Sequence, residues 1–185
     1  MVKNFVISGS GGQGILSIGS ILANIFMLDN LFVTYCTCYG AEMRGGAVNC
    51  EISMSEREIY TIQNDKADYV IALNQTSFDK FISKVKENGT IIVNSSLATI
   101  NKTRKDIRYI FAPLTQEAQK LGNTKIANSI ALGILSKIAG NFSIENVKLA
   151  YKKILKNKEE LVQKNIEAFL LGYNYIQEER LWHTG

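Results

Sequence analysis

Histidine, proline and cysteine are scarce in this sequence of 185 residues, which holds one His, one Pro and three Cys. The one histidine, His183, lies two residues from the C-terminal end, so we expect no Ser/His/Asp or Cys/His arrangement for nucleophilic catalysis. Carboxylates do not form a cluster that would indicate a two-metal or glycosidase centre. We therefore expect no catalytic residue that acts in this chain alone.

The cysteines Cys36, Cys38 and Cys50 are too few for a cluster or a structural metal. Structural zinc sites and iron–sulfur clusters are usually held by four ligands, and His183 is a poor fourth candidate. Cys36 and Cys38 are too close to bond to each other within one extended strand, so we expect reduced thiols. The sequence predicts no bound metal.

Long apolar runs are absent as well. The longest, at residues 15–28, is interrupted by small and polar residues and is too short to span a bilayer. The first eight residues lack the cleavage site of a signal peptide, so we expect a cytoplasmic protein without a membrane span. With 46% hydrophobic and 21% charged residues, the composition is that of an average globular protein. The length predicts one domain over residues 1–185.

The formal net charge is +4, and part of the excess lies in one basic run that contains Lys102, Arg104, Lys105 and Arg108. This run could contact an acidic partner or a phosphate, or it could be a solvated loop or strand edge. The charges are not interleaved with aromatic residues or placed along a helix face, so a nucleic-acid surface is not indicated.

Hydrophobic periodicity and turn residues predict strands that alternate with helices in the first two thirds of the chain. We expect strands at 3–8, 31–36, 47–54, 69–73, 90–93 and 109–111, and helices at 15–28, 76–86, 115–121, 126–139, 143–155 and 159–179. The strand at 47–54 alternates apolar and polar residues, which predicts an edge strand or one arm of a hairpin. The pattern predicts an α/β fold with helices on both sheet faces and a helical last third.

A glycine-rich segment follows the first strand and precedes the first helix. It reads Gly9, Ser10, Gly11, Gly12, Gln13, Gly14 and fits the GxGxxG pattern, whose backbone N–H groups can bind an anion. The residues at 34–36 include no Asp or Glu for a ribose, so a nicotinamide dinucleotide is disfavoured. Gly14 is not followed by Lys and Ser or Thr, so the segment is not a P-loop. The alternative is a tight turn without a ligand.

A second glycine-flanked segment spans residues 39–46, between two expected strands. In it, Arg44 beside Gly45 can approach a carboxylate or phosphate closely, because guanidinium offers two parallel donors. The alternative is a hairpin turn in which Glu42 and Arg44 form a weak surface pair.

Five motifs, read together, are similar to one known family. They are GSGGQG at 9–14, YGAEMRGG at 39–46, ALN at 72–74, VNSS at 93–96 and GNTKIANSIALG at 122–133. Over most of its length the chain resembles the gamma subunit of 2-oxoacid:ferredoxin (acceptor) oxidoreductases, which is equivalent to one domain of the fused pyruvate enzymes. The spacing of GGQG and EMRGG is more specific than either motif alone.

The resemblance implies a Rossmann-like, three-layer α/β/α domain with a mixed, mostly parallel sheet. It further implies a hetero-oligomer with alpha and beta subunits, which can include a ferredoxin-like delta subunit. Such a complex decarboxylates a 2-oxoacid, transfers the acyl group to coenzyme A and reduces ferredoxin or a similar acceptor. Its thiamine diphosphate, magnesium and iron–sulfur clusters belong mainly to the other subunits, and this sequence has no Gly-Asp-Gly thiamine motif. The motif spelling favours 2-oxoglutarate as the 2-oxoacid.

On this resemblance we expect both glycine segments to face the subunit junction and to contact the phosphates of coenzyme A. Arg44 is the expected anion contact, and Gln13 and Asn74 are expected to position polar groups. The terminal helices and the basic run are the expected docking surfaces. The alternative is a free-standing nucleotide-binding or regulatory module that uses the same glycine segment without catalysis.

Overall fold

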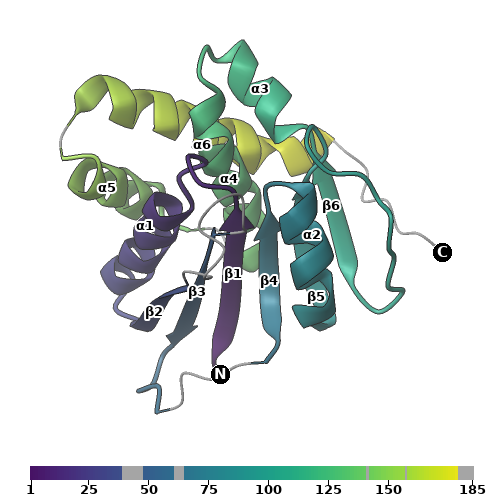
Figure 1. Cartoon of the computed structure of the whole chain (residues 1–185). Coiled ribbons are helices and arrows are strands. Elements are labelled where there is room, and N and C mark those ends of the chain that lie inside the picture. Colours follow the sequence, from purple (N-terminus) through teal and green to yellow (C-terminus); the bar gives the residue numbers. More distant parts are fainter. Residues whose placement is uncertain (39–47, 61–64, 141, 157, 179–185) are drawn as a thin grey trace.

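Six strands form one sheet in the order β2-β3-β1-β4-β5-β6 (Figure 1). The computed structural model describes residues 1–38, 48–60, 65–140, 142–156 and 158–178. β3 runs antiparallel to both β1 and β2, whereas β1, β4, β5 and β6 are parallel neighbours, so the predicted mixed, mostly parallel sheet is confirmed. The strands are β1 (Lys3–Gly9), β2 (Phe32–Cys38), β3 (Val48–Ser55), β4 (Ala67–Ala72), β5 (Val85–Asn94) and β6 (Arg108–Ala112).

Except for α2, the helices lie close to their predicted positions. Ser143 accepts a hydrogen bond from the backbone N–H of Asn146 at 3.5 Å and so caps α5, as a serine at a helix start commonly does. None of the helices within the described ranges is long and apolar enough to cross a membrane. The helical segments are α1 (Ile15–Leu28), α2 (Gln75–Phe81), η1 (Ile82–Lys84), α3 (Leu114–Lys120), η2 (Thr124–Ile126), α4 (Ala127–Ala139), α5 (Ile144–Ile154) and α6 (Glu159–Glu178).

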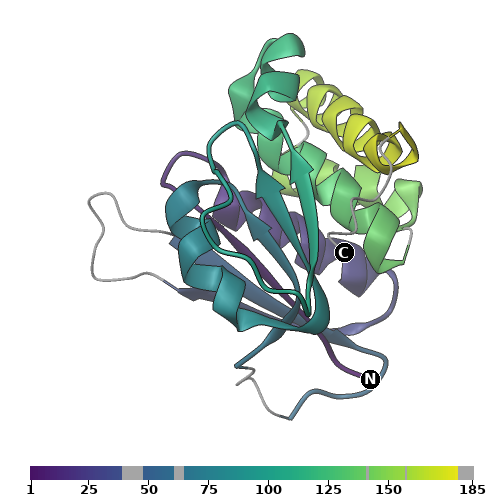
Figure 2. The same ribbon diagram turned by 90° about the vertical axis from the view of Figure 1, so that its right-hand side faces the viewer.

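Helices cover both faces of the sheet, and β1 contributes to a core on each face. Phe5 and Ile7 point into the larger core, beneath α1 and α4, and Val6 points into the smaller core with Phe78 of α2. α6 packs on the outer side of α4, so that the helical last third lies mainly on one face (Figure 2). This arrangement is the α/β architecture that the sequence predicts.

The pairing of β3 decides between the two alternatives that its sequence predicts. β3 is an arm of a hairpin with β2, as predicted, but it is not an edge strand, because β1 pairs with its other side. Cys50 and Ile52 are buried in the larger core, and the polar Asn49 and Ser53 on the opposite face are only 5% and 7% exposed. Alternation along a strand predicts one polar face, but it does not tell how many strands lie beside it.

The helix predicted at 76–86 is too long. α2 ends at Phe81, and a 3₁₀ turn leads directly into β5, which begins at Val85. Asn88 has a positive φ of 62° and donates its backbone N–H to the carbonyl of Asp106 at 2.7 Å, where the pairing of β4 with β5 shifts register. The turn residues at 88–89 therefore mark an irregularity within β5 and not the end of the helix.

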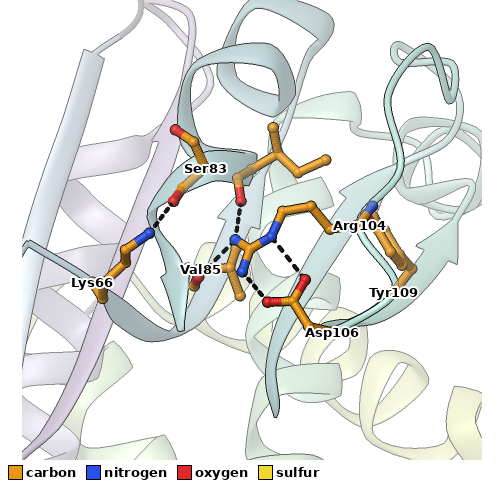
Figure 3. A network of polar contacts seen from close by, with 7 residues as sticks. Lys66, Ser83, Val85, Arg104, Asp106 and Tyr109 are labelled. Carbon is orange, nitrogen blue, oxygen red and sulfur yellow. Dashed lines mark hydrogen bonds and ion pairs between the residues drawn. The ribbon is translucent and has the colours of Figure 1, made fainter. Parts of the chain in front are cut away.

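Arg104 of the basic run is bound into the fold (Figure 3). Its guanidinium donates to the carbonyls of Ile82 and Val85 at 2.9 and 2.8 Å and forms an ion pair with Asp106. Its backbone N–H donates to the Tyr109 hydroxyl at 2.6 Å. The hydrogen bond with Arg104 lowers the pKa of the Asp106 carboxyl below its usual value. Arg104 thus anchors the segment before β6 to η1 and the start of β5. Docking through the other basic residues of the run stays a prediction.

Candidate functional site

The segment at residues 9–14, here called the glycine loop, leaves the sheet at the carboxyl end of β1 and leads into α1. The chain continues from β1 to α1 on one face and from the adjacent β4 to α2 on the other, so the direction of winding reverses between these two strands. In open α/β sheets, ligands bind outside the carboxyl ends of the strands at such a reversal. Sheet topology therefore places a candidate site at the glycine loop.

Side-chain hydrogen bonds hold the loop against the end of β4. Gln13 Oε1 accepts from the Ser10 backbone N–H at 2.6 Å, and Gln13 Nε2 lies 3.4 Å from the Leu73 carbonyl. Asn74 Nδ2 donates to Ser10 Oγ at 2.6 Å, while Asn74 Oδ1 accepts from the Ser77 N–H at 2.9 Å and caps α2. The structure thus brings the predicted positions Gln13 and Asn74 together, from two different strand ends.

The glycines of the loop are required for different reasons, namely close packing at Gly9 and a positive φ at Gly12 and Gly14. A Cβ on Gly9 would stand 2.6 Å from Gln13 Oε1, and Gly12 and Gly14 have φ values of 87° and 70° that other residues rarely adopt. Gly11 is exposed, its φ is not positive, and no atom of the described chain lies within 4 Å of the place of its Cβ. Within the described part of the chain, the fold leaves space at Gly11 for another molecule.

Asn128, at the start of α4, is a site residue that we did not predict. Its Nδ2 donates to the carbonyls of Gln13 and Gly14 at 3.0 and 3.3 Å, and its side chain is 8% exposed. Because both carbonyls are held toward α4, the loop conformation depends on a contact across more than one hundred residues. In the sequence, Asn128 stands out only as part of the motif at 122–133, and no local pattern indicates that it contacts the glycine loop.

A cleft of about 180 Å³ adjoins the glycine loop, between the ends of β4 and β5 and the starts of α3 and α4. Its polar lining includes Gln13, Asn94, Thr115, Thr124 and Lys125. Asn94 Nδ2 donates to Thr115 Oγ1 at 2.8 Å, which ties the end of β5 to α3. Of the described residues that line the cleft, Lys125 alone carries a charge, so the cleft favours an anion.

The second predicted segment begins and ends beside the glycine loop. Cys38 pairs with Asn49 where the hairpin opens, and Val48 pairs with Gly9. The chain therefore leaves β1 and β2 at the same end of the sheet. The predicted positions Glu42, Arg44 and Gly45 themselves lie outside the described residues.

Metal ligands are not gathered anywhere in the described part of the chain. There, no three His, Cys, Asp or Glu residues lie close enough together to hold a metal ion. Cys36 is half-buried and Cys50 is buried, each on a separate strand of the hairpin. The described residues do not fit an iron–sulfur cluster or the magnesium of thiamine diphosphate.

Known proteins share this fold and sequence. The sequence profile of the family described as pyruvate ferredoxin/flavodoxin oxidoreductase matches residues 4–175. The 2-oxoglutarate synthase subunit KorC of Methanothermobacter marburgensis is 31% identical over 96% of this chain and 98% of its own length. The gamma subunit of a keto/oxoacid ferredoxin oxidoreductase from Geobacter sulfurreducens has a TM-score of 0.83 at 27% identity, covering 96% of this chain and 99% of that one.

One further solved structure is larger than this chain. It is the 2-oxoglutarate:ferredoxin oxidoreductase of Magnetococcus marinus, solved with 2-oxoglutarate, coenzyme A and succinyl-CoA bound. The TM-score is 0.85 at 24% identity, and the match covers 99% of this chain but 32% of that one. At this identity the likeness establishes the shared fold. The fold of this chain therefore also occurs as one part of a longer polypeptide.

Proposed function

Because the chain belongs to the pyruvate ferredoxin/flavodoxin oxidoreductase family, we propose that it is the gamma subunit of a 2-oxoacid oxidoreductase that acts on 2-oxoglutarate. The observation that carries this proposal is the end-to-end match with a 2-oxoglutarate synthase subunit, which covers nearly all of both chains. Such a match is expected if this chain, like that relative, is a separate subunit. A module of unrelated function that shared only the glycine loop would match over a short segment.

In this role the chain assembles with alpha and beta subunits, with or without a ferredoxin-like delta subunit, as one domain over residues 1–185. The complex decarboxylates 2-oxoglutarate, transfers the acyl group to coenzyme A and passes the electrons to ferredoxin or a similar acceptor. Thiamine diphosphate, magnesium and iron–sulfur clusters supply the decarboxylation and electron transfer. We assign these groups to the other subunits, because the described residues of this chain offer no cluster of ligands.

We assign to this chain a contact with the phosphates of coenzyme A at the subunit junction. Its predicted residues are those of the glycine loop, joined by Asn74 and by Arg44 with its neighbours Glu42 and Gly45. The reversal point of the sheet, the space at Gly11 and the adjoining cleft support this contact. Backbone N–H groups at the start of α1 suit a phosphate, since they carry the positive end of the helix dipole.

Purification from the source organism tests the subunit proposal. The chain would carry a small affinity tag and be isolated without oxygen, and the proteins that accompany it would be identified by mass spectrometry. We expect larger subunits that contain thiamine diphosphate and iron–sulfur clusters. A chain that purifies alone and binds a nucleotide would overturn the proposal and support a free-standing nucleotide-binding module.

Arg44→Ala in the purified complex tests the contact with coenzyme A. Loss of a charge-assisted hydrogen bond of about 1.5–3 kcal/mol raises KM for coenzyme A roughly tenfold or more. Arg57→Ala is the control, because Arg57 is an exposed arginine that follows the C-terminal end of β3, whereas Arg44 precedes β3 in the chain. Unchanged KM values for both coenzyme A and 2-oxoglutarate would show that Arg44 has no such role.

A further inference from the structure

Lys125 carries a charge that the described fold does not use. It is exposed in η2, just before α4, and it lines the cleft beside the glycine loop. Its Nζ forms no hydrogen bond or ion pair with any described residue. The nearby Lys120, at the end of α3, is paired, since its Nζ lies 2.6 Å from a carboxylate oxygen of Glu117. Lys125 is therefore available to a bound molecule.

Further hydrogen-bond donors surround the same space. Thr115 Oγ1 accepts from Asn94 Nδ2 at 2.8 Å, which leaves the hydroxyl proton free to point into the cleft. Thr124 and Gly12 of the glycine loop also line the cleft. None of the described lining residues has a carboxylate. One cation and several donors without a negative charge favour a phosphate-type anion.

The size and position of the cleft indicate which phosphate group fits. Its volume of about 180 Å³ is more than ten times the ~10–15 Å³ that holds one water, so it accommodates more than a single small ion. It adjoins the first strand–loop–helix unit, where the diphosphates of dinucleotides bind in folds of this kind. Leu97, 46% exposed, adds an apolar wall suited to an aliphatic chain.

We propose that Lys125, with the hydroxyls of Thr115 and Thr124, binds the diphosphate of coenzyme A in this cleft. The proposal rests on the proposed function and adds a cation from η2 to the contact at the glycine loop. Coenzyme A then lies between the glycine loop and the start of α4, with its aliphatic arm along Leu97. Lys125 contributes to binding and takes no part in the chemical steps.

The experiment measures binding of coenzyme A to the purified complex by isothermal titration calorimetry, without 2-oxoacid. We expect Lys125→Ala to raise Kd about tenfold for both coenzyme A and dephospho-coenzyme A, which share the diphosphate. Lys125→Arg keeps the charge and should retain most of the affinity. Lys148→Ala on α5 removes the same charge from an exposed position away from the cleft and should leave Kd unchanged. The effect of Lys125→Ala should shrink between 0.05 and 0.5 M salt.

The alternative results separate this inference from the proposed function. Weaker binding of coenzyme A alone, with dephospho-coenzyme A unaffected, would place Lys125 at the 3′-phosphate and overturn the assignment. Unchanged Kd values for Lys125→Ala alongside a raised Kd for Arg44→Ala would refute the Lys125 inference and leave the proposed function standing. If the wild-type complex bound neither compound and reduced no acceptor, the proposed function itself would be wrong.

Discussion

The contact between Asn128 and the glycine loop predicts a measurable coupling between two distant positions. A Cβ on Gly14 would stand 2.5 Å from Asn128 Nδ2, closer than side-chain atoms approach each other. Gly14→Ala should therefore lower the free energy of unfolding for two reasons. The φ of 70° disfavours any residue with a Cβ, and the new methyl group collides with Asn128. Asn128→Ala removes the collision and also removes the two hydrogen bonds.

The magnitudes follow from these contacts. The left-handed backbone alone costs Gly14→Ala about 1–2 kcal/mol of unfolding free energy, and the collision adds to that value. Asn128→Ala loses two hydrogen bonds worth about 0.5–1.5 kcal/mol each, or about 1–3 kcal/mol in total. Since the collision is absent from the double variant, its destabilisation should fall short of the sum of the single values by about 1 kcal/mol.

Urea denaturation of the four proteins, followed by circular dichroism at constant pH, measures this coupling. Asn165→Ala on α6 is a further control, since Asn165 accepts a hydrogen bond from Ser129 at 2.6 Å and forms no hydrogen bond with the described residues of the glycine loop. We expect Asn165→Ala and Gly14→Ala to be additive. Additive values for Gly14→Ala and Asn128→Ala, within about 0.5 kcal/mol, would refute the collision and the loop anchoring inferred from it.

Three further substitutions test other contacts. The hydrogen bond with Arg104 lowers the pKa of Asp106 below its usual value of 3.8, so the ion pair stabilises the fold above that pH. This stabilisation is lost as the pH falls through the lowered pKa of the folded state. Asp106→Asn should therefore flatten the decline of the urea midpoint between about pH 5 and 2. In Gly172→Ala a new Cβ would collide with the Ile130 carbonyl of α4, so unfolding free energy should fall by about 1–3 kcal/mol. Burial raises the pKa of the Tyr151 hydroxyl in the folded protein, whereas in the unfolded chain this hydroxyl ionises near pH 10. The free energy of unfolding should therefore decrease above pH 10. Tyr151→Phe should leave the free energy of unfolding unchanged at pH 7 and make this decrease smaller.

For each of these three predictions, one result would contradict the reasoning. An unchanged acid profile for Asp106→Asn, equal to that of the exposed control Asp65→Asn, would show that the ion pair contributes nothing. Gly172→Ala must cost more than Asn174→Ala, which alters an exposed position of the same helix. A loss of more than about 1 kcal/mol in Tyr151→Phe at pH 7 would mean that the buried hydroxyl is hydrogen-bonded.

Local sequence determined the features that the pattern predicted well. The first strand, the glycine loop and the first helix follow one another because glycine permits the positive φ at Gly12 and Gly14 and apolar residues recur at helical spacing up to Leu28. The helix predicted from residue 143 begins there for a similar local reason, since the Ser143 side chain caps α5. Such features depend on neighbours within a few residues.

Features that depend on distant partners could not be predicted. The insertion of β3 between β2 and β1 is decided by pairing over the whole sheet, and a strand's own alternation is the same at an edge or in the interior. Asn128 and Lys125 reach the site because α4 packs beside the glycine loop. Arg104 belongs to the basic run, but its guanidinium donates to the carbonyls of Ile82 in η1 and Val85 in β5.

The candidate site was therefore predicted in part. Gln13 and Asn74 are expected on the family resemblance, and the structure brings Asn74 Nδ2 and Gln13 Oε1 to 3.5 Å from each other. The cleft and its lysine arise from the packing of four elements, which no single motif encodes. For Arg44 the role in binding stays a prediction.

The most direct test of the central claim is the rate at which the purified complex reduces a viologen dye with 2-oxoglutarate, measured with and without coenzyme A. The same assay would offer pyruvate, a branched-chain 2-oxoacid and indolepyruvate at equal concentration. We predict dye reduction that requires coenzyme A and is fastest with 2-oxoglutarate. No reduction with any 2-oxoacid would contradict assignment to an oxidoreductase complex, and a faster coenzyme A-dependent rate with another 2-oxoacid would contradict the proposed substrate.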